Sequence, residues 1–237
     1  GSVDAFVELM NQKAASLGCT NTHFTNPNGL PDETHYTTAA DMAKIARAAW
    51  FNPTFRKFAS TQYYEIPPTN KFAETRYLLN HHKMMKGQTY AYDGVLGGKT
   101  GYTEVAGNTL VTYAKNDNTY LVSVVLQSVN GAYSDTKALL DYGFNNFSRT
   151  AVKDLPSKIT RHLLPAEKYI LKDYKDDTLF ETRRTASVSL PSGVDSNALE
   201  KTYSITKNPA GLPLLTVTYT YNDHVVGSAR YYQTKLL

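Results

Sequence analysis

Apolar side chains recur at helical spacing in two segments near the start of the chain. Over residues 3–17 they return every three or four positions, and Gly18 follows where a helix would end. Residues 37–50 repeat the pattern, and Pro53 stands beyond them as a helix breaker. The residues between the two segments are rich in Asn, Pro and Gly, which are typical of turns. The pattern predicts two amphipathic helices joined by an ordered loop.

The clearest strand signals follow later in the chain. Residues 108–115 and 120–126 are rich in β-branched and aromatic side chains, and they flank the turn residues Asn116-Asp117-Asn118. This arrangement predicts a β-hairpin. Residues 133–147 return to helical spacing, and we expect this third helix to pack on the hairpin sheet.

The signal between residues 60 and 98 is weaker. Residues 61–69 fit a strand closed by two prolines, and residues 76–87 fit either a helix or a loop. His81 and His82 suggest a metal site, but neighbouring strand residues point to opposite faces and no acidic residue stands at ligand spacing. We therefore expect these histidines to lie on the surface or to form hydrogen bonds.

Beyond Arg149 the helical patterns stop and short strand-like runs take over. These runs cover residues 157–164, 167–173, 185–191, 201–207 and 213–233. Over residues 215–221 of the last run, apolar residues alternate strictly with threonines, and Asn222-Asp223 turns the chain back. The sequence therefore predicts a mixed α and β domain over residues 1–149 and a small all-β, sandwich-like domain over residues 150–237.

Composition excludes several functional classes. The 25 basic and 21 acidic residues leave a formal net charge of +4, too small and too dispersed to indicate nucleic-acid binding. The single cysteine, Cys19, excludes an internal disulfide and is expected to be a small buried hydrophobe. No apolar run approaches the roughly 20 residues needed to cross a bilayer. Gly1-Ser2 resemble the remnant of tag cleavage and are left out of the fold reasoning.

One short stretch, GGKTGYTEVAG at residues 97–107, carries the candidate chemistry. The ammonium of Lys99 and the hydroxyl of Thr100 stand side by side, which suits a carboxylate or a developing oxyanion. The missing side chain at Gly101 would let an extended peptide pair with the strand. We expect these residues to end a short strand at the edge of the hairpin sheet. The bare tripeptide recurs by chance too often to assign a function alone.

The surrounding residues make the pattern far more specific. The run FVELMN to ARAA at residues 6–49, followed by GGKTGYTEVAGNTLV at 97–111, resembles the low-molecular-mass penicillin-binding proteins that act as serine D-alanyl-D-alanine carboxypeptidases. The resemblance covers residues 3 to 149 and implies an α/β (α+β) penicillin-binding-protein or β-lactamase-like transpeptidase domain, incomplete here, followed by the small β domain.

The resemblance also implies roles for particular residues. Lys99, Thr100 and Gly101 would bind the terminal carboxylate end of a peptidoglycan stem peptide, and the backbone N–H of Tyr102 would contribute to the oxyanion hole. Family members often carry histidine where this chain has Tyr102 and Asn28, so their substrate preference does not transfer. No metal or organic cofactor is implied.

Two family elements, S-x-x-K with its nucleophilic serine and S-x-N, should lie before Phe6, and neither is present anywhere before Lys99. Three imitations stand after Lys99, in the wrong order, at residues 128–130, 134–137 and 204–207. We interpret the chain as N-terminally truncated and expect the polypeptide to be catalytically inert. Loss of the preceding elements should expose apolar surface, which suggests self-association.

By resemblance, the intact protein would trim the terminal D-alanine from stem pentapeptides through an acyl-enzyme and would be acylated by β-lactams. It would act outside the cytoplasmic membrane, held there by a C-terminal anchor that is missing from this chain. Two alternatives stay open. One is a peptidoglycan-binding module without turnover, and the other is a β-lactamase, which the extra β domain disfavours.

Overall fold

The structure is a computed structural model that describes residues 1–152, 164–165, 180–181, 186–208, 210 and 212–233. The chain forms two compact units, Gly1–Phe144 and Asn145–Leu237. The division expected after residue 149 falls inside strand β6 (Phe147–Val152), whose pairing partner lies in the second unit. Among the residues described, no helix is both long and apolar enough to span a bilayer.

The first unit contains four helices: α1 (Val3–Ser16), α2 (Ala39–Trp50), α3 (Pro53–Ser60) and α4 (Ala132–Asn146). The helices predicted over residues 3–17, 37–50 and 133–147 are confirmed. Helix α3 was not predicted, because Pro53 looked like the end of the preceding helix. Instead, the side chain of Asn52 caps a new helix, and Pro53 occupies its first turn, where no backbone N–H is needed.

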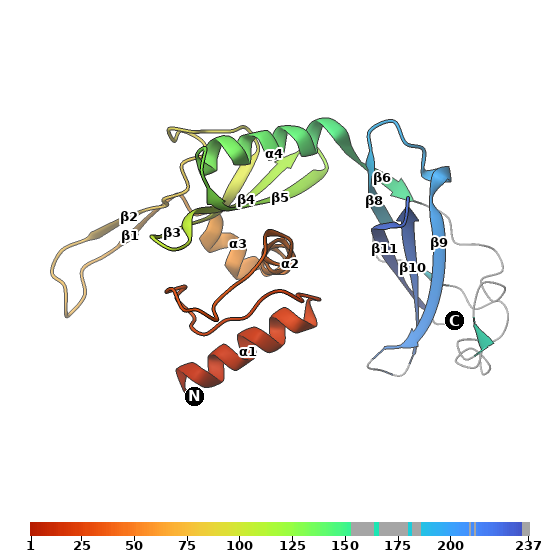
Figure 1. Cartoon of the computed structure of the whole chain (residues 1–237), viewed down its shortest axis with the longest axis horizontal. Coiled ribbons are helices and arrows are strands. Elements are labelled where there is room, and N and C mark those ends of the chain that lie inside the picture. Colours follow the sequence, from red (N-terminus) through yellow and green to blue (C-terminus); the bar gives the residue numbers. More distant parts are fainter. Residues whose placement is uncertain (153–163, 166–179, 182–185, 209, 211, 234–237) are drawn as a thin grey trace. The chain divides into compact units, whose positions relative to one another are not determined.

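The sheet of the first unit is a meander with the strand order β3-β4-β5. Its strands are β3 (Val95–Thr103), β4 (Gly107–Asn116) and β5 (Thr119–Ser128), all antiparallel, and the predicted hairpin is its second half. Figure 1 shows α4 along one face of this sheet and α2 and α3 on the other. The core under α4 contains Met84, Leu110, Ala114, Val125, Ala132 and Leu140.

One aromatic contact joins α2 to the opposite face of the sheet. The ring of Trp50 stacks on the ring of Tyr113 in β4, with 4.2 Å between ring centroids. The hydroxyl of Tyr113 donates to the carbonyl of Ala46, 2.9 Å away, so the buried oxygen has a partner. Burial raises the pKa of Tyr113 to about 12. The contact fixes α2 against the sheet.

A two-stranded hairpin, β1 (Tyr63–Ile66) and β2 (Arg76–Leu79), projects from the first unit (Figure 1). The strand predicted within residues 61–69 is confirmed. The helix or loop predicted for residues 76–87 is wrong over β2, where four residues pair with β1 as a strand. The sequence pattern over residues 76–79 was ambiguous because these residues become a strand through pairing with β1, and their own hydrophobic periodicity does not determine it.

The described residues of the second unit form two packed sheets. One has the order β7-β11-β10-β9 and the other pairs β6 with β8. The strands not yet given are β7 (Phe180–Glu181), β8 (Ala186–Pro191), β9 (Glu200–Lys207), β10 (Pro213–Tyr221) and β11 (His224–Gln233). Side chains from both sheets, including Val188, Leu215 and Tyr219, share one core, as expected of a sandwich. The strand predicted at 167–173 lies outside the described residues, and so does the strand predicted at 157–164 except for Leu164, which is not in a strand.

Apolar side chains remain exposed on two helices of the first unit. In α1, Leu9 is 60% exposed, and in α4, Leu139 is 47% exposed. Phe6 and Tyr142 add to the same two faces. Such surface usually finds a partner, so the self-association expected of this polypeptide stays a prediction that these exposures support.

Candidate active site

The Lys-Thr-Gly residues lie within the edge strand of the three-stranded sheet. The expectation that they end a short strand is wrong, because β3 pairs with β4 through Lys99, Thr100 and Gly101 as far as Thr103. The Lys99 ammonium is exposed and donates to the carbonyl of Thr100. The Thr100 hydroxyl makes no hydrogen bond to any residue described. Both polar groups are therefore available to a ligand.

A cavity of about 800 Å³ opens beside this strand. Lys99, Thr100, Gly101 and Tyr102 line it, and so does the loop between α1 and α2. Further lining side chains come from that loop, from α1 and α2 and from the start of α4: Phe24, Asn26, Asn28, His35, Met10, Met42 and Tyr133. The structure thus brings all four predicted site residues to one cavity.

Side-chain hydrogen bonds hold the loop of residues 21–36 in place. The carboxamide of Asn11 in α1 accepts from the backbone N–H of Phe24 and donates to its carbonyl, at 2.8 and 2.9 Å. The carboxamide oxygen of Asn26 accepts from the backbone N–H groups of Gly29 and Leu30 and so closes the turn. The density of Asn and Gly predicted an ordered loop, and these bonds supply the order.

A buried carboxylate anchors the start of the same loop. Asp41, in the first turn of α2, is 2% exposed and accepts from the backbone N–H of Asn21, the hydroxyl of Thr22 and the ammonium of Lys44. Lys44 also donates to the carbonyl of Gly18. The hydrogen bonds from Lys44 and Asn21 hold the pKa of Asp41 below its usual value.

We expect acid to weaken this anchor. Because the pKa of Asp41 is lowered by folding, its contribution to stability is present above its unfolded pKa of about 4 and is lost as the pH falls through the folded value. Asp41→Asn should therefore be less stable than the wild type near neutral pH and should lose less stability on acidification. Thermal unfolding from about pH 7 to about pH 2 measures this, with Glu33→Gln as a control on the same loop. Equal acid sensitivity in Asp41→Asn and wild type would contradict it.

His35 adds a directed donor to the cavity wall. The backbone N–H of Thr25 donates to His35 Nδ1 at 3.1 Å, so this nitrogen must be the unprotonated one. The proton of the neutral ring then sits on Nε2, which has no hydrogen-bond partner among the residues described. The ring is held edge-on against Phe24, with 5.6 Å between centroids. Sequence reasoning missed His35, since nothing local shows that the loop faces β3.

His82 supports the back of the strand that carries Lys99. It is fully buried, and its Nε2 lies 2.9 Å from the Thr112 hydroxyl. Its burial holds its pKa below the usual value. The ring packs directly on Gly98, where an added Cβ would lie 2.7 Å from His82 Cδ2 and 2.0 Å from the carbonyl oxygen of Val111. Of the two expected roles, hydrogen bonding is confirmed for His82. His81 is exposed.

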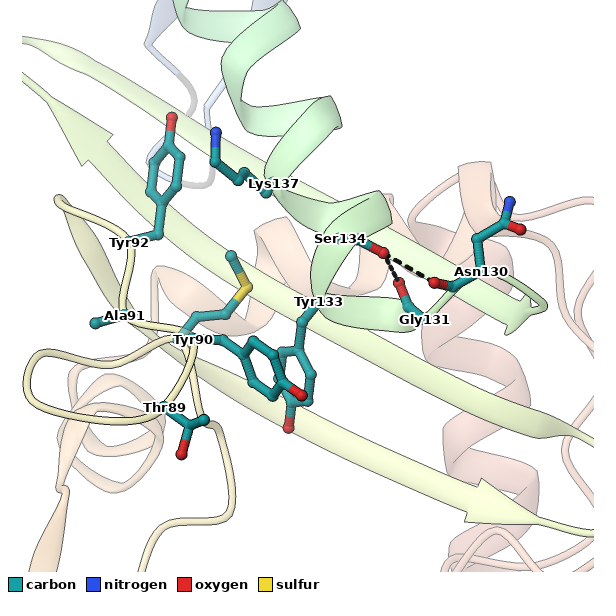
Figure 2. Close-up of a pocket in the computed structure, with 10 residues that line it drawn as sticks. Thr89, Tyr90, Ala91, Tyr92, Asn130, Gly131, Tyr133, Ser134 and Lys137 are labelled. Carbon is teal, nitrogen blue, oxygen red and sulfur yellow. Dashed lines mark hydrogen bonds between the residues drawn. The ribbon is translucent and has the colours of Figure 1, made fainter.

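Two of the imitation motifs contain serines with hydrogen-bond partners: Ser128 donates to the Asp135 carboxylate at 2.6 Å, and Ser134 donates to backbone carbonyls. Ser134 donates to the carbonyls of Asn130 and Gly131 within the first turn of α4, as Figure 2 shows, and Lys137 pairs with Asp141. Helix α4 begins at Ala132, so Ser134 lies inside its first turn. No group of three or more His, Cys, Asp or Glu side chains in the described part of the chain could hold a metal ion.

Comparison with known proteins agrees with this geometry. A family model described as D-alanyl-D-alanine carboxypeptidase matches residues 1–130. The carboxypeptidase DacF of Bacillus subtilis is 35% identical over 151 residues, which cover 62% of this chain and 37% of that protein. DacB2 of Mycobacterium tuberculosis is also 35% identical over 151 residues, which cover 61% of this chain and 50% of that protein. The chain therefore spans half or less of the length of these two relatives.

Solved structures of two carboxypeptidases resemble the fold. The enzyme from Mycobacterium tuberculosis is 34% identical, with a TM-score of 0.53, over 61% of this chain and 55% of that one. DacD from Francisella tularensis, at 22% identity, shares the fold with a TM-score of 0.58 over 99% of this chain and 68% of that one, so its likeness extends to the second unit. With the family model matching more than half of its residues, the chain belongs to the D-alanyl-D-alanine carboxypeptidase family.

Proposed function

We infer that the whole protein is a serine D-alanyl-D-alanine carboxypeptidase and that the described residues form the part of its site that receives the substrate. The observation that carries this proposal is the position of Lys99 and Thr100, on an edge strand and beside a cavity of about 800 Å³. An edge strand can accept an extended peptide as one more strand. The Lys99 ammonium would then neutralise the terminal carboxylate, and the Thr100 hydroxyl would orient it.

In this proposal, the nucleophilic serine and the lysine that activates it are not among these 237 residues. A serine hydroxyl would attack the carbonyl carbon of the penultimate D-alanine, and the peptide bond to the terminal D-alanine would break. Water would then hydrolyse the acyl-enzyme. The backbone N–H of Tyr102 would donate to the oxyanion formed in each step. In this scheme, Gly101 leaves space for the substrate backbone on β3.

The substrate class and location follow from the same proposal. The substrate would be the stem peptide of peptidoglycan, which places the reaction outside the cytoplasmic membrane. A β-lactam would acylate the same serine because its strained amide imitates the scissile peptide bond. Support for both comes from family membership together with the carboxylate-binding chemistry of the Lys-Thr-Gly strand.

Covalent labelling with a fluorescent penicillin tests the proposal. We expect the whole protein to give a band that survives denaturation and to release D-alanine from a D-alanyl-D-alanine peptide. The 237-residue polypeptide should give neither, because it lacks the nucleophile and its lysine. A covalent band on this polypeptide would contradict the assignment of the nucleophile. A whole protein that binds the peptide without labelling or release would instead fit the non-catalytic binding module.

A further inference from the structure

A second, smaller cavity of about 440 Å³ lies between α4 and the loop that leads into β3. Figure 2 shows its walls: Thr89, Tyr90, Ala91 and Tyr92 come from the loop, and Tyr133, Ser134 and Lys137 come from α4. The buried side chain of Met84 closes it on one side. No step of the proposed reaction uses this cavity, although Tyr133 lines both cavities and therefore joins them.

Aromatic rings form one wall of the cavity. Tyr90 and Tyr133 lie nearly parallel, with 4.7 Å between centroids and 14° between planes. Tyr133 is fixed in turn by a hydrogen bond from its hydroxyl to the carbonyl of His81. Tyr90 is 52% exposed, so its ring is accessible to a ligand while its stacked partner holds it in place. A held, accessible tyrosine ring suits a flat, partly apolar ligand.

The charges at the cavity cancel one another. The Lys137 ammonium pairs with the Asp141 carboxylate, and the Tyr92 hydroxyl donates to the other oxygen of that carboxylate at 2.9 Å. Desolvation together with this hydrogen bond raises the pKa of Tyr92 to about 12, so the phenol stays neutral. Because Lys137 and Asp141 neutralise one another, the cavity favours an uncharged ligand over an anion or a cation.

Polar groups at the rim offer hydrogen bonds without charge. The carboxamide of Asn130 is exposed and makes no hydrogen bond to the residues described, so it can both donate and accept. The Ser134 hydroxyl donates its hydrogen bond to backbone carbonyls, but its oxygen can still accept one from a ligand. An aromatic wall with neutral donors and acceptors at its rim is the chemistry that recognises a sugar, whose C–H face stacks and whose edge is polar.

We propose that this cavity binds an N-acetylhexosamine unit of a glycan strand. The proposal rests on the proposed function, because the stem peptide of that substrate is carried on such a strand. A five-residue extended peptide spans up to about 17 Å, enough for its sugar to lie outside the larger cavity when its carboxylate is at Lys99. The shared wall at Tyr133 puts the second cavity next to the first.

Titration of the 237-residue polypeptide with the N-acetylglucosamine trimer, followed by NMR or calorimetry, tests the proposal. Tyr90→Ala should weaken binding about tenfold, as expected for the loss of one aromatic stacking contact, and Tyr90→Phe should stay close to wild type. Asn130→Ala should weaken binding as well. Tyr120→Ala is the matched control, since Tyr120 is 53% exposed on β5 and lines neither cavity.

A parallel titration with a D-alanyl-D-alanine peptide separates the two proposals. Binding of the trimer that survives Tyr90→Ala, or no binding at millimolar trimer, would overturn the sugar site. Binding of the trimer that Tyr90→Ala weakens, alongside a peptide that fails to bind, would support the sugar site and count against the proposed function. Tyr90→Ala should leave the affinity for the peptide unchanged.

Discussion

Gly98→Ala should prevent the first unit from folding, because its methyl group would meet the backbone. The new Cβ would lie 2.0 Å from the carbonyl oxygen of Val111, on the strand paired with β3, and 2.7 Å from the buried ring of His82. Neither neighbour can turn aside, since one is backbone and the other is enclosed on all sides. Overpacking a well-packed core costs about 1–3 kcal/mol, and a clash with backbone should exceed that range.

The matched control for Gly98→Ala is Gly101→Ala on the same strand. There the new Cβ would meet only the Thr109 hydroxyl, at 2.5 Å, and that side chain can rotate. We expect Gly101→Ala to fold and to bind the D-alanyl-D-alanine peptide poorly, and Gly98→Ala to show no cooperative unfolding of the first unit. Circular dichroism and urea denaturation distinguish the two. A Gly98→Ala protein with wild-type stability would show that β3 does not lie against His82 and Val111 as described.

Lys99→Ala should lower the release of D-alanine by the whole protein about 100- to 1000-fold. The expected size is that of removing one charge-assisted donor that is held in position for the substrate. Lys115→Ala is the control, since Lys115 lies on the neighbouring strand and lines neither cavity. The assay is D-alanine release from an N-acylated peptide ending in D-alanyl-D-alanine.

A second substrate shows what Lys99 contacts. A peptide ending in a carboxamide lacks the negative charge, so the wild-type protein should process it poorly and Lys99→Ala should process it no worse. Such non-additivity is the signature of two groups in contact. If instead the losses from Lys99→Ala and from the carboxamide multiply, Lys99 acts on some other part of the reaction.

Strong local periodicity explains which elements the sequence predicted. The helix at 3–17 and the hairpin around Asp117 follow from apolar spacing and turn residues, and Asp117 adopts the positive φ of 48° that such a turn requires. Helix α3 was not predicted because Asn52-Pro53 can either end one helix or begin another. The hydrogen bonds that the Asn52 side chain accepts show that it begins one here.

The candidate site likewise has one part that the sequence predicted and one part that it did not. Lys99 and Thr100 could be recognised from the sequence because they are neighbours in one short motif, Lys99-Thr100-Gly101. The opposite wall was not, because His35 reaches the cavity through contacts between distant segments, such as the bonds of Asn11 to Phe24 and of Asp41 to Asn21. The burial of His82 likewise depends on an absent side chain at Gly98, which no local pattern of polarity reveals.

The stack of Trp50 on Tyr113 also gives this protein a built-in optical reporter. Trp50 is the only tryptophan in the chain, and it lies in the first unit, at the contact between α2 and the sheet. Tryptophan emission excited at long wavelength therefore follows the unit that carries Lys99 and is silent about the β sandwich. Far-ultraviolet circular dichroism follows both, so comparing the two signals during denaturation reads out the cooperativity between the units.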